Sequence, residues 1–294
     1  MITILNDHEI YLTYSWNYTN HGICGHTFEV IDYYLLLKNH FNIGILLQEN
    51  IDQEIFRKAI SEKYNLDDIE IQDILDNTVY HYKSKIIKCK NLIVVDGAIY
   101  SLKKQSLLCD NVFLFGCGDK DIINVNKKNW HVLLDHRIYG EYGINYIKKI
   151  NFKRLKFPSY SDKKTLIYAT ESSRYLSREY VEKLVSKYPD NFIIICNEID
   201  KYRDIKNTEI VKPPINNLSS RFDKYLYTPT LLKNDCSPRF IAECKYFKKE
   251  VEYYDIDYLE KDLGLKYRIQ DLKNIGDISL EEDDEIIEIL KGII

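Results

Sequence analysis

Hydrophobic residues along the chain gather into short runs that alternate with longer amphipathic segments, and this alternation predicts an α/β fold. In the amino-terminal half the short runs, rich in β-branched and aromatic residues, cover residues 9–16, 42–48, 91–100, 111–118 and 130–139. Runs of this kind are typical of parallel strands that are covered on both faces. Residues 26–40 and 51–76 carry apolar positions at helical spacing, so we expect helices there.

The pattern is interrupted at residues 148–164, a basic and polar stretch with few aliphatic side chains, where we expect a domain boundary. Beyond it a helix is predicted over residues 177–189, together with further strands. These strands are TLIYAT, NFIIICN, EIV, KYLYTP and EVEYYD. Such an order forms parallel sheets with right-handed crossovers. We therefore expect two Rossmann-like domains facing each other across a cleft, residues 1–155 and residues 156–294, the second with a closing carboxyl-terminal helix.

Composition narrows the class of protein. Of the 294 residues, 45% are hydrophobic and 29% are charged, as in soluble globular proteins, and the net charge of −4 argues against a surface that binds polyanions everywhere. The seven cysteines form no C-x-x-C pair, so we expect reduced, mostly buried thiols and no metal site. Without a targeting signal or a long apolar span, the chain is expected to be cytoplasmic, with no transmembrane segment. Its richness in Ile, Lys, Asn and Tyr suits an AT-rich viral or bacterial genome.

The stretch DCSPRFIAE, residues 235–243, places polar chemistry where a strand passes into a helix. Ser237 is a good N-cap and Pro238 fits the first helical position, so a helix is expected to begin after the strand KYLYTP. The free N–H groups at such a helix start favour a phosphate, and Lys233 and Arg239 on either side add charge-assisted contacts. The same stretch therefore predicts a phosphate site.

Two acidic residues in this stretch point to sugar hydroxyls. Glu243, deeper in the predicted helix, is suited to a bidentate hydrogen bond with the two hydroxyls of a ribose, and Asp235 in the loop can hold sugar hydroxyls farther out. The competing interpretation is an ordinary capped helix with Glu243 on its solvent side. In either case we expect Phe240, Cys244 and Phe247 to face the sheet.

The acidic pair resembles the donor motif of GT-B glycosyltransferases, in which two acidic residues flank seven others. The resemblance, specific over about residues 165–257, implies that Glu243 binds the ribose of a nucleotide sugar and Asp235 contacts the transferred sugar. The family more often has Glu at the first position, and Asp235 reaches less far. The resemblance also implies a donor site in the carboxyl-terminal domain, an acceptor site in the amino-terminal domain, and no metal or further cofactor. UDP is the commonest donor nucleotide in the family, and the acid pair is commoner in its retaining enzymes.

The connection TESSRYLSR, which follows the first strand of the second domain, offers cations for a diphosphate. The resemblance implies this role for Arg174, while Arg178 stands roughly where the family has a lysine. Cations near a leaving diphosphate stabilise its developing charge without a metal, so Arg174 and Lys233 are candidate catalytic residues. The alternative is a solvated helix start.

The loop HGICGHT, residues 21–27, is a second candidate site. Gly22 and Gly25 permit positive φ angles and close backbone approach, and the family has a similar glycine loop near the donor phosphates and the acceptor. His26 is a candidate general base or sugar contact, although a histidine at a helix start also serves as a cap or packs in the core. Rival bases follow other strands of the same half: Asp96, Asp135 and His136.

Other motifs are weaker. GCGDKD lacks the third glycine of a dinucleotide fingerprint and no P-loop motif occurs, which disfavours dehydrogenases and P-loop enzymes. DID, residues 255–257, resembles the metal-binding D-x-D of GT-A enzymes but follows the last clear strand. The basic stretch KKINFKRLK is either a solvated linker or a groove for nucleic acid, with Phe152 and Phe157 as stacking partners.

These features together predict a metal-independent glycosyltransferase. It would move a hexose from a nucleotide sugar, UDP-linked, to a hydroxyl of a glycan, a lipid-linked glycan or another acceptor, with retention as an option. One alternative is a viral DNA-modifying glucosyltransferase acting on a hydroxylated base, so that nucleic acid would be the acceptor. Another is a non-catalytic nucleotide- or glycan-binding protein of the same fold.

Overall fold

The computed structural model contains two compact units. The first unit comprises residues 1–155 and 278–294, and the second comprises residues 156–277. The last helix, α11 (Asp284–Ile293), which we expected to close the second domain, belongs to the first unit. Within the two units the structure describes residues 2–14, 23, 25–48, 51–81, 86–95, 106–115, 128–134, 144–145, 151–158, 162–169, 176–212, 218–228, 239–254 and 284–294.

An eight-stranded sheet forms the centre of the first unit. Its strands are β1 (Ile2–Ile4), β2 (Ile10–Tyr14), β3 (Ile43–Gln48), β4 (Thr78–His81), β5 (Ile86–Val95), β6 (Ser106–Phe115), β7 (Trp130–Leu134) and β8 (Ile144–Asn145). Seven of them hydrogen-bond in the order β4-β3-β2-β5-β6-β7-β8, and β1 also pairs with β5. All of these pairings are parallel.

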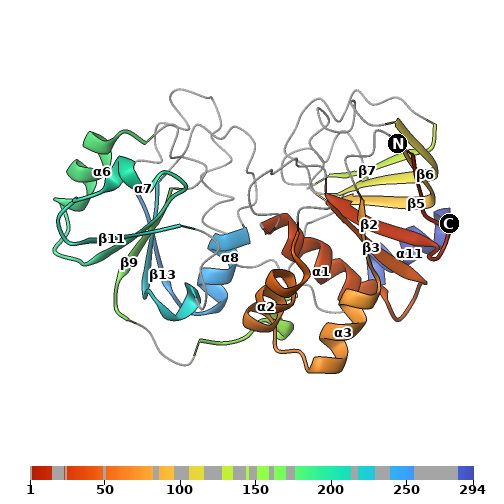
Figure 1. Ribbon diagram of the computed structural model, residues 1–294, viewed down its shortest axis with the longest axis horizontal. Coiled ribbons are helices and arrows are strands. Elements are labelled where there is room, and N and C mark those ends of the chain that lie inside the picture. Colours follow the sequence, from red (N-terminus) through yellow and green to blue (C-terminus); the bar gives the residue numbers. More distant parts are fainter. Residues whose placement is uncertain are drawn as a thin grey trace. The chain divides into compact units, whose positions relative to one another are not determined.

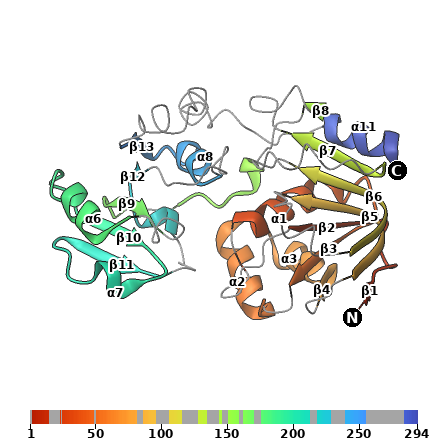
Figure 2. The same ribbon diagram turned by 90° about the horizontal axis from the view of Figure 1, so that it is seen from above.

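Helices cover both faces of this sheet. α1 (Gly25–Leu37), α2 (Gln53–Lys63) and α3 (Asp68–Asp76) lie on one face, and α11 lies on the other (Figures 1 and 2). The ring of Tyr33 in α1 meets that of Phe115 in β6, with the centroids 5.2 Å apart. The apolar stripe of α11 is buried through Ile286, Ile287 and Leu290. This double cover explains why the strands read as continuous apolar runs.

The segment predicted to be helical, residues 51–76, forms two helices, α2 and α3. The chain leaves α2 at Tyr64, which forms an antiparallel bridge with Leu155. Asp67 then caps α3: its side chain accepts the N–H of Glu70, and the Glu70 carboxylate accepts the N–H of Asp67. This reciprocal capping box satisfies two free donors and begins a new helix.

A partly buried ladder of polar side chains crosses the first sheet. Asn91 Nδ2 in β5 donates to the carbonyl oxygen of Glu9 at 3.0 Å, and Asn111 Nδ2 in β6 donates to Asn91 Oδ1 at 2.9 Å. Asn111 Oδ1 lies 3.2 Å from His131 Nε2 in β7. Burial lowers the pKa of His131, so its ring is neutral near pH 7. The ladder satisfies these amides where an apolar side chain would be the usual choice.

The described part of the basic stretch is packed against protein. Phe152, in a single 3-10 turn (Phe152–Arg154), is buried, and Arg154 Nη1 lies 3.0 Å from Glu70 Oε1. The ring of Phe157 meets that of Phe247, with the centroids 5.3 Å apart. Phe152 therefore cannot stack on a base, and the nucleic-acid interpretation loses one of its two aromatic contacts.

A five-stranded sheet forms the second unit. Its strands are β9 (Thr165–Tyr168), β10 (Phe192–Ile195), β11 (Thr208–Val211), β12 (Lys224–Tyr227) and β13 (Glu250–Tyr253). They pair in the order β11-β10-β9-β12-β13, and all pairings are parallel. Each of these strands lies within or overlaps a strand predicted from the sequence. Within the described residues of this unit the helices are α6 (Arg178–Val185), α7 (Ile199–Tyr202) and α8 (Arg239–Tyr246), with a 3-10 turn at Leu218–Ser220.

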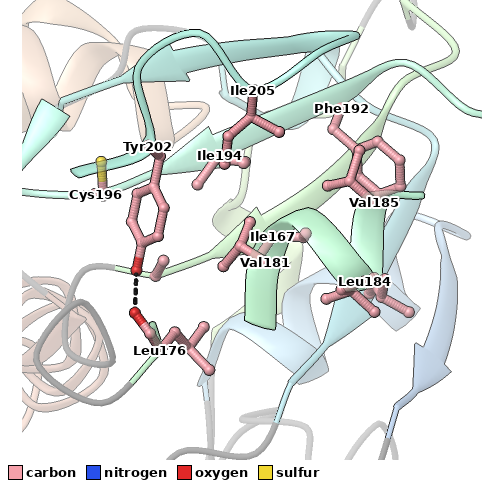
Figure 3. Close-up of a cluster of buried hydrophobic side chains, with 12 residues drawn as sticks. Ile167, Leu176, Val181, Leu184, Val185, Phe192, Ile194, Cys196, Tyr202 and Ile205 are labelled. Carbon is pink, nitrogen blue, oxygen red and sulfur yellow. Dashed lines mark hydrogen bonds between the residues drawn. The ribbon is translucent and has the colours of Figure 1, made fainter. Parts of the chain in front are cut away.

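Side chains from α6, α7 and the strands form the core on one face of the second sheet (Figure 3). Val181 and Leu184 of α6 pack with Ile167 and Phe192, and the hydroxyl of Tyr202 donates to the carbonyl oxygen of Leu176 at 2.9 Å. On the other face Phe240 of α8 packs on Tyr225, with ring centroids 5.0 Å apart. Phe240 and Cys244 thus face the sheet, as predicted.

Both sheets have a doubly wound strand order, which confirms an α/β fold with two Rossmann-like units. The order reverses between β2 and β5 in the first sheet and between β9 and β12 in the second. In open parallel sheets, ligands bind outside the carboxyl ends of the strands at such a switch point. The opposed GT-B arrangement of the two units stays a prediction. None of the helices in the described ranges is long and apolar enough to cross a bilayer.

Candidate functional site

The switch point of each unit lies where the sequence analysis placed candidate residues. In the first unit, β2 ends at Tyr14 and α1 begins at Gly25, directly before His26. In the second unit, β12 ends at Tyr227 and α8 begins at Arg239, one turn before Glu243.

The His26 ring is paired with a carboxylate that sequence reasoning missed. His26 Nδ1 lies 3.4 Å from Glu29 Oε2, one turn further along α1. The Glu29 side chain is only 2% exposed, and that of His26 is 18% exposed. The ring of Tyr14 at the end of β2 lies 6.3 Å from that of His26. Spacing of three residues was the available signal, because positions i and i+3 share one face of a helix.

Gly25 does not need the conformational freedom that we expected of it. It is the first residue of α1, its φ is not in the left-handed region, and an added Cβ would meet no described atom within 4 Å. The positive φ that a glycine permits is therefore not used at Gly25, because the residue has already joined the helix. Its expected role in donor binding stays a prediction.

Glu243 is buried and ion-paired with Arg239. Its side chain is 4% exposed, and Glu243 Oε1 lies 2.5 Å from Arg239 Nε, four residues earlier in α8. The competing interpretation, which put this carboxylate on the solvent side of the helix, is wrong, because α8 turns that side towards protein. A buried carboxylate is tolerated when it is paired and hydrogen-bonded. Arg239 neutralises Glu243 in this structure, and its expected contact with a phosphate stays a prediction.

Tyrosines end three adjacent strands of the second sheet, another feature that sequence reasoning missed. Tyr168, Tyr227 and Tyr253 are the last residues of β9, β12 and β13, and all three are half-buried. The Tyr227 and Tyr253 centroids are 5.9 Å apart, and Tyr168 lies 5.3 Å from Phe240 of α8. Burial raises the pKa of Tyr253 to about 12, so this phenol is protonated in the physiological range. The repeated ending in TLIY, KYLY and EVEY was the signal.

Thr228, the residue after β12, holds a buried hydroxyl at the switch point. The side chain is buried, and within the described ranges Oγ1 has no hydrogen-bond partner. A buried hydroxyl that makes no hydrogen bond costs free energy, which a hydrogen bond to a ligand would recover. Thr228 is therefore a further candidate binding residue.

Arg178 has a structural role. Its Nε lies 2.7 Å from Glu182 Oε1 within α6, and its Nη1 donates to the carbonyl oxygen of Arg203 at 2.6 Å. These contacts tie α6 to the end of α7. The expected diphosphate contact of Arg178 gains no support from this geometry.

Several predicted site residues lie outside the described residues. They are Gly22, Asp96, Asp135, His136, Arg174, Lys233, Asp235, Ser237 and Pro238. Among the residues that the structure does describe, no three His, Cys, Asp or Glu side chains gather as a metal site would require. The four described cysteines, Cys89, Cys109, Cys196 and Cys244, are buried free thiols, as composition predicts.

Comparison with known proteins gives only weak structural likeness. No family model and no curated protein matches the chain. Among solved structures, it is similar to the crystal structure of Acinetobacter baumannii MurG. The sequence identity is 7% and the TM-score 0.32, over 96% of this chain and 99% of that chain. A likeness of this strength assigns neither relationship nor activity, so function is argued from the residues.

Each connection has its own chemical capacity. In the first unit, a histidine with one ring nitrogen on a carboxylate can accept a proton at the other nitrogen. In the second unit, a buried carboxylate, a helix start and the hydroxyl of Thr228 can bind hydroxyls and a phosphate. Transfer of a glycosyl group uses polyol–phosphate binding and, where the configuration is inverted, proton acceptance by a side chain.

Proposed function

We propose that the protein is a metal-independent glycosyltransferase of the GT-B type that uses a nucleotide sugar, UDP-linked, as hexose donor. The observation that carries the proposal is the buried Glu243 carboxylate, one turn inside the helix that follows β12 at the switch point. A carboxylate in this position suits the two hydroxyls of a ribose. Its spacing from Asp235, eight positions earlier, matches the acid pair of the family that the sequence resembles.

The second unit would bind the donor. Glu243 takes the ribose, Asp235 the hexose, and the start of α8 with Ser237, Pro238 and Arg239 takes the diphosphate. Arg174 and Lys233 supply positive charge to the leaving diphosphate, which removes the need for a metal ion. The hydroxyl of Thr228 adds a hydrogen bond at the carboxyl end of β12.

The first unit would bind the acceptor, with His26 as general base and the loop containing Gly22 and Gly25 near the reacting groups. The acceptor hydroxyl gives its proton to His26 Nε2 while its oxygen bonds to the anomeric carbon. The bond from that carbon to the diphosphate oxygen breaks, and the electron pair leaves with the diphosphate. This route inverts the anomeric carbon; if the enzyme retains configuration, His26 is a sugar contact instead. The anomeric configuration of the product, read by NMR, distinguishes the two routes.

Calorimetric titration with UDP, other nucleoside diphosphates and their sugars tests donor binding. Glu243→Gln keeps the size of the side chain but removes the charge, and we expect it to weaken nucleotide binding about 10- to 100-fold. Glu250→Gln is the matched control, because Glu250 is 68% exposed at the start of β13, the opposite end of the strands. Circular dichroism confirms that each variant is folded. If no nucleotide binds, or if Glu243→Gln binds as the wild type does, the proposal is wrong.

Turnover separates an enzyme from a binding protein. A glycosyltransferase is expected to release the nucleoside diphosphate slowly when water takes the sugar and faster when an acceptor takes it, whereas tight binding without turnover indicates the non-catalytic alternative. Glycan acceptors and duplexes containing hydroxylated bases are offered in parallel. Transfer only to the duplexes would support the DNA-modifying alternative.

A further inference from the structure

The two buried carboxylates of α1 have different partners. Asp32, which is fully buried, accepts a hydrogen bond from the hydroxyl of Tyr64 at 3.0 Å. Glu29, one turn nearer the amino end of α1, lies 3.4 Å from the ring nitrogen Nδ1 of His26. Burying a carboxylate costs free energy unless it is hydrogen-bonded. Both carboxylates meet this requirement, and Glu29 meets it through a residue at the switch point.

We infer that Glu29 is a positioning residue for His26. When its carboxylate accepts the Nδ1–H of the imidazole, the neutral ring is held as the Nδ1–H tautomer, with the lone pair on Nε2. The same contact fixes the orientation of the ring and stabilises the imidazolium that forms when Nε2 takes a proton. The pairing needs no substrate, and its catalytic consequence rests on the proposed function.

The location of the pair supports this role. His26 keeps 18% of its side-chain surface exposed, while Glu29 beneath it is almost completely covered. The Glu29 carboxylate is therefore inaccessible to a substrate that enters from solvent, whereas the partly exposed ring of His26 is accessible. Both residues belong to the same helix, so α1 holds them one turn apart whatever the adjoining loop does.

Long-range ¹H–¹⁵N NMR of protein labelled at histidine tests the pairing directly. The His26 signals are assigned by their loss in His26→Gln. We expect a neutral His26 to show the Nδ1–H tautomer in the wild type, and Glu29→Gln to move both of its nitrogen signals. Glu54→Gln, in the first turn of α2, is the control that should leave them in place. His8, whose Nδ1 lies 2.9 Å from Asn42 Oδ1, is an internal reference in every sample.

Kinetics test the catalytic consequence. Once a transferred sugar is detected, Glu29→Gln should lower kcat about 10- to 100-fold, the range for carboxylates that orient a functional histidine, with the donor KM unchanged. Glu29→Asp should recover part of the loss.

The outcomes are separable. An Nε2–H tautomer in the wild type, or His26 signals that Glu29→Gln leaves in place, overturns the inference even if Glu29→Gln is poorly stable. An unchanged kcat in Glu29→Gln also overturns it. The expected NMR result in a protein that binds and transfers no sugar supports the pairing and removes the proposed function instead.

Discussion

Arg239 and Glu243 form a buried ion pair across one turn of α8, with 2.5 Å between Arg239 Nε and Glu243 Oε1. Removing one partner of such a pair leaves a buried charge without its counter-charge, at a cost of about 3–5 kcal/mol. Glu243→Leu should therefore lower the free energy of unfolding by about this amount, measured by urea denaturation. The double variant Arg239→Met with Glu243→Leu should recover most of the loss. If Glu243→Leu is as stable as the wild type, the pair does not form in solution.

Thr228→Val tests the buried hydroxyl at the end of β12. Valine has nearly the same shape, and Thr228 Oγ1 has no hydrogen-bond partner in the described ranges, so the stability of the free protein should be unchanged or slightly higher. Nucleotide affinity should fall about 5- to 10-fold, as for one neutral hydrogen bond. Differential scanning calorimetry with and without nucleotide measures both effects. A destabilised free protein would show that the hydroxyl already has a partner.

Gly25→Ala separates helix stability from ligand contact. Alanine at this helical position has open space around its Cβ and should stabilise the protein by about 0.5–1 kcal/mol. Gly44→Ala is the contrasting variant, because its Cβ would stand 2.4 Å from His8 Cδ2 and should destabilise. If Gly25→Ala also leaves nucleotide and acceptor kinetics unchanged, Gly25 has no role in binding. Impaired kinetics in a stabilised protein would instead show a ligand close to its backbone.

The buried hydroxyl of Tyr202 should make the free energy of unfolding depend on pH in the alkaline range. Burial raises the pKa of Tyr202, whose hydroxyl donates to the carbonyl oxygen of Leu176. Because of the raised pKa, the unfolded chain releases the phenol proton at a lower pH than the folded protein does. The contribution of Tyr202 to the free energy of unfolding is therefore complete below about pH 10 and declines as the pH rises above it. Tyr202→Phe should lose about 1–3 kcal/mol at pH 7, because the buried carbonyl loses its donor.

Denaturation at several pH values between 7 and 11 measures this effect. The fall in unfolding free energy above pH 10 should be shallower in Tyr202→Phe than in the wild type. Parallel curves would mean that Tyr202 ionises with its ordinary pKa in the folded protein.

The hydrophobic pattern predicts strands well where both faces are buried, as in β2 and β10, and it also locates the less buried edge strands of the second sheet, β11 and β13. It misses β1 because Ile2 and Ile4 are mostly exposed, and a run of three residues has no measurable period. The same pattern predicts that β5 begins at residue 91, whereas the strand begins at Ile86. The exposed Lys88 and Lys90 interrupt the apolar run in its first half. Short or one-sided strands depend on neighbours that local sequence does not specify.

The sequence predicts where in the fold the candidate sites lie, but only part of the contacts that their residues make. Strand-to-helix connections with His26 and with Glu243 could be located from periodicity and capping residues. The burial of Glu243 could not, because a glutamate in an amphipathic helix is usually exposed and only the packing of α8 covers it, whereas its contact with Arg239 follows from the spacing of four residues. The same is true of Glu29, whose function depends on which face of α1 meets the sheet.

The ladder of Asn91, Asn111 and His131 restricts how the long strands of the first sheet can align during folding. Sliding β6 along β5 by two residues would still present apolar side chains to the core. It would, however, separate the amide of the buried Asn91 from that of the half-buried Asn111 and break the hydrogen bond between them. The lost hydrogen bond raises the free energy of such a misaligned intermediate. The two amides therefore favour the native register of β5 and β6.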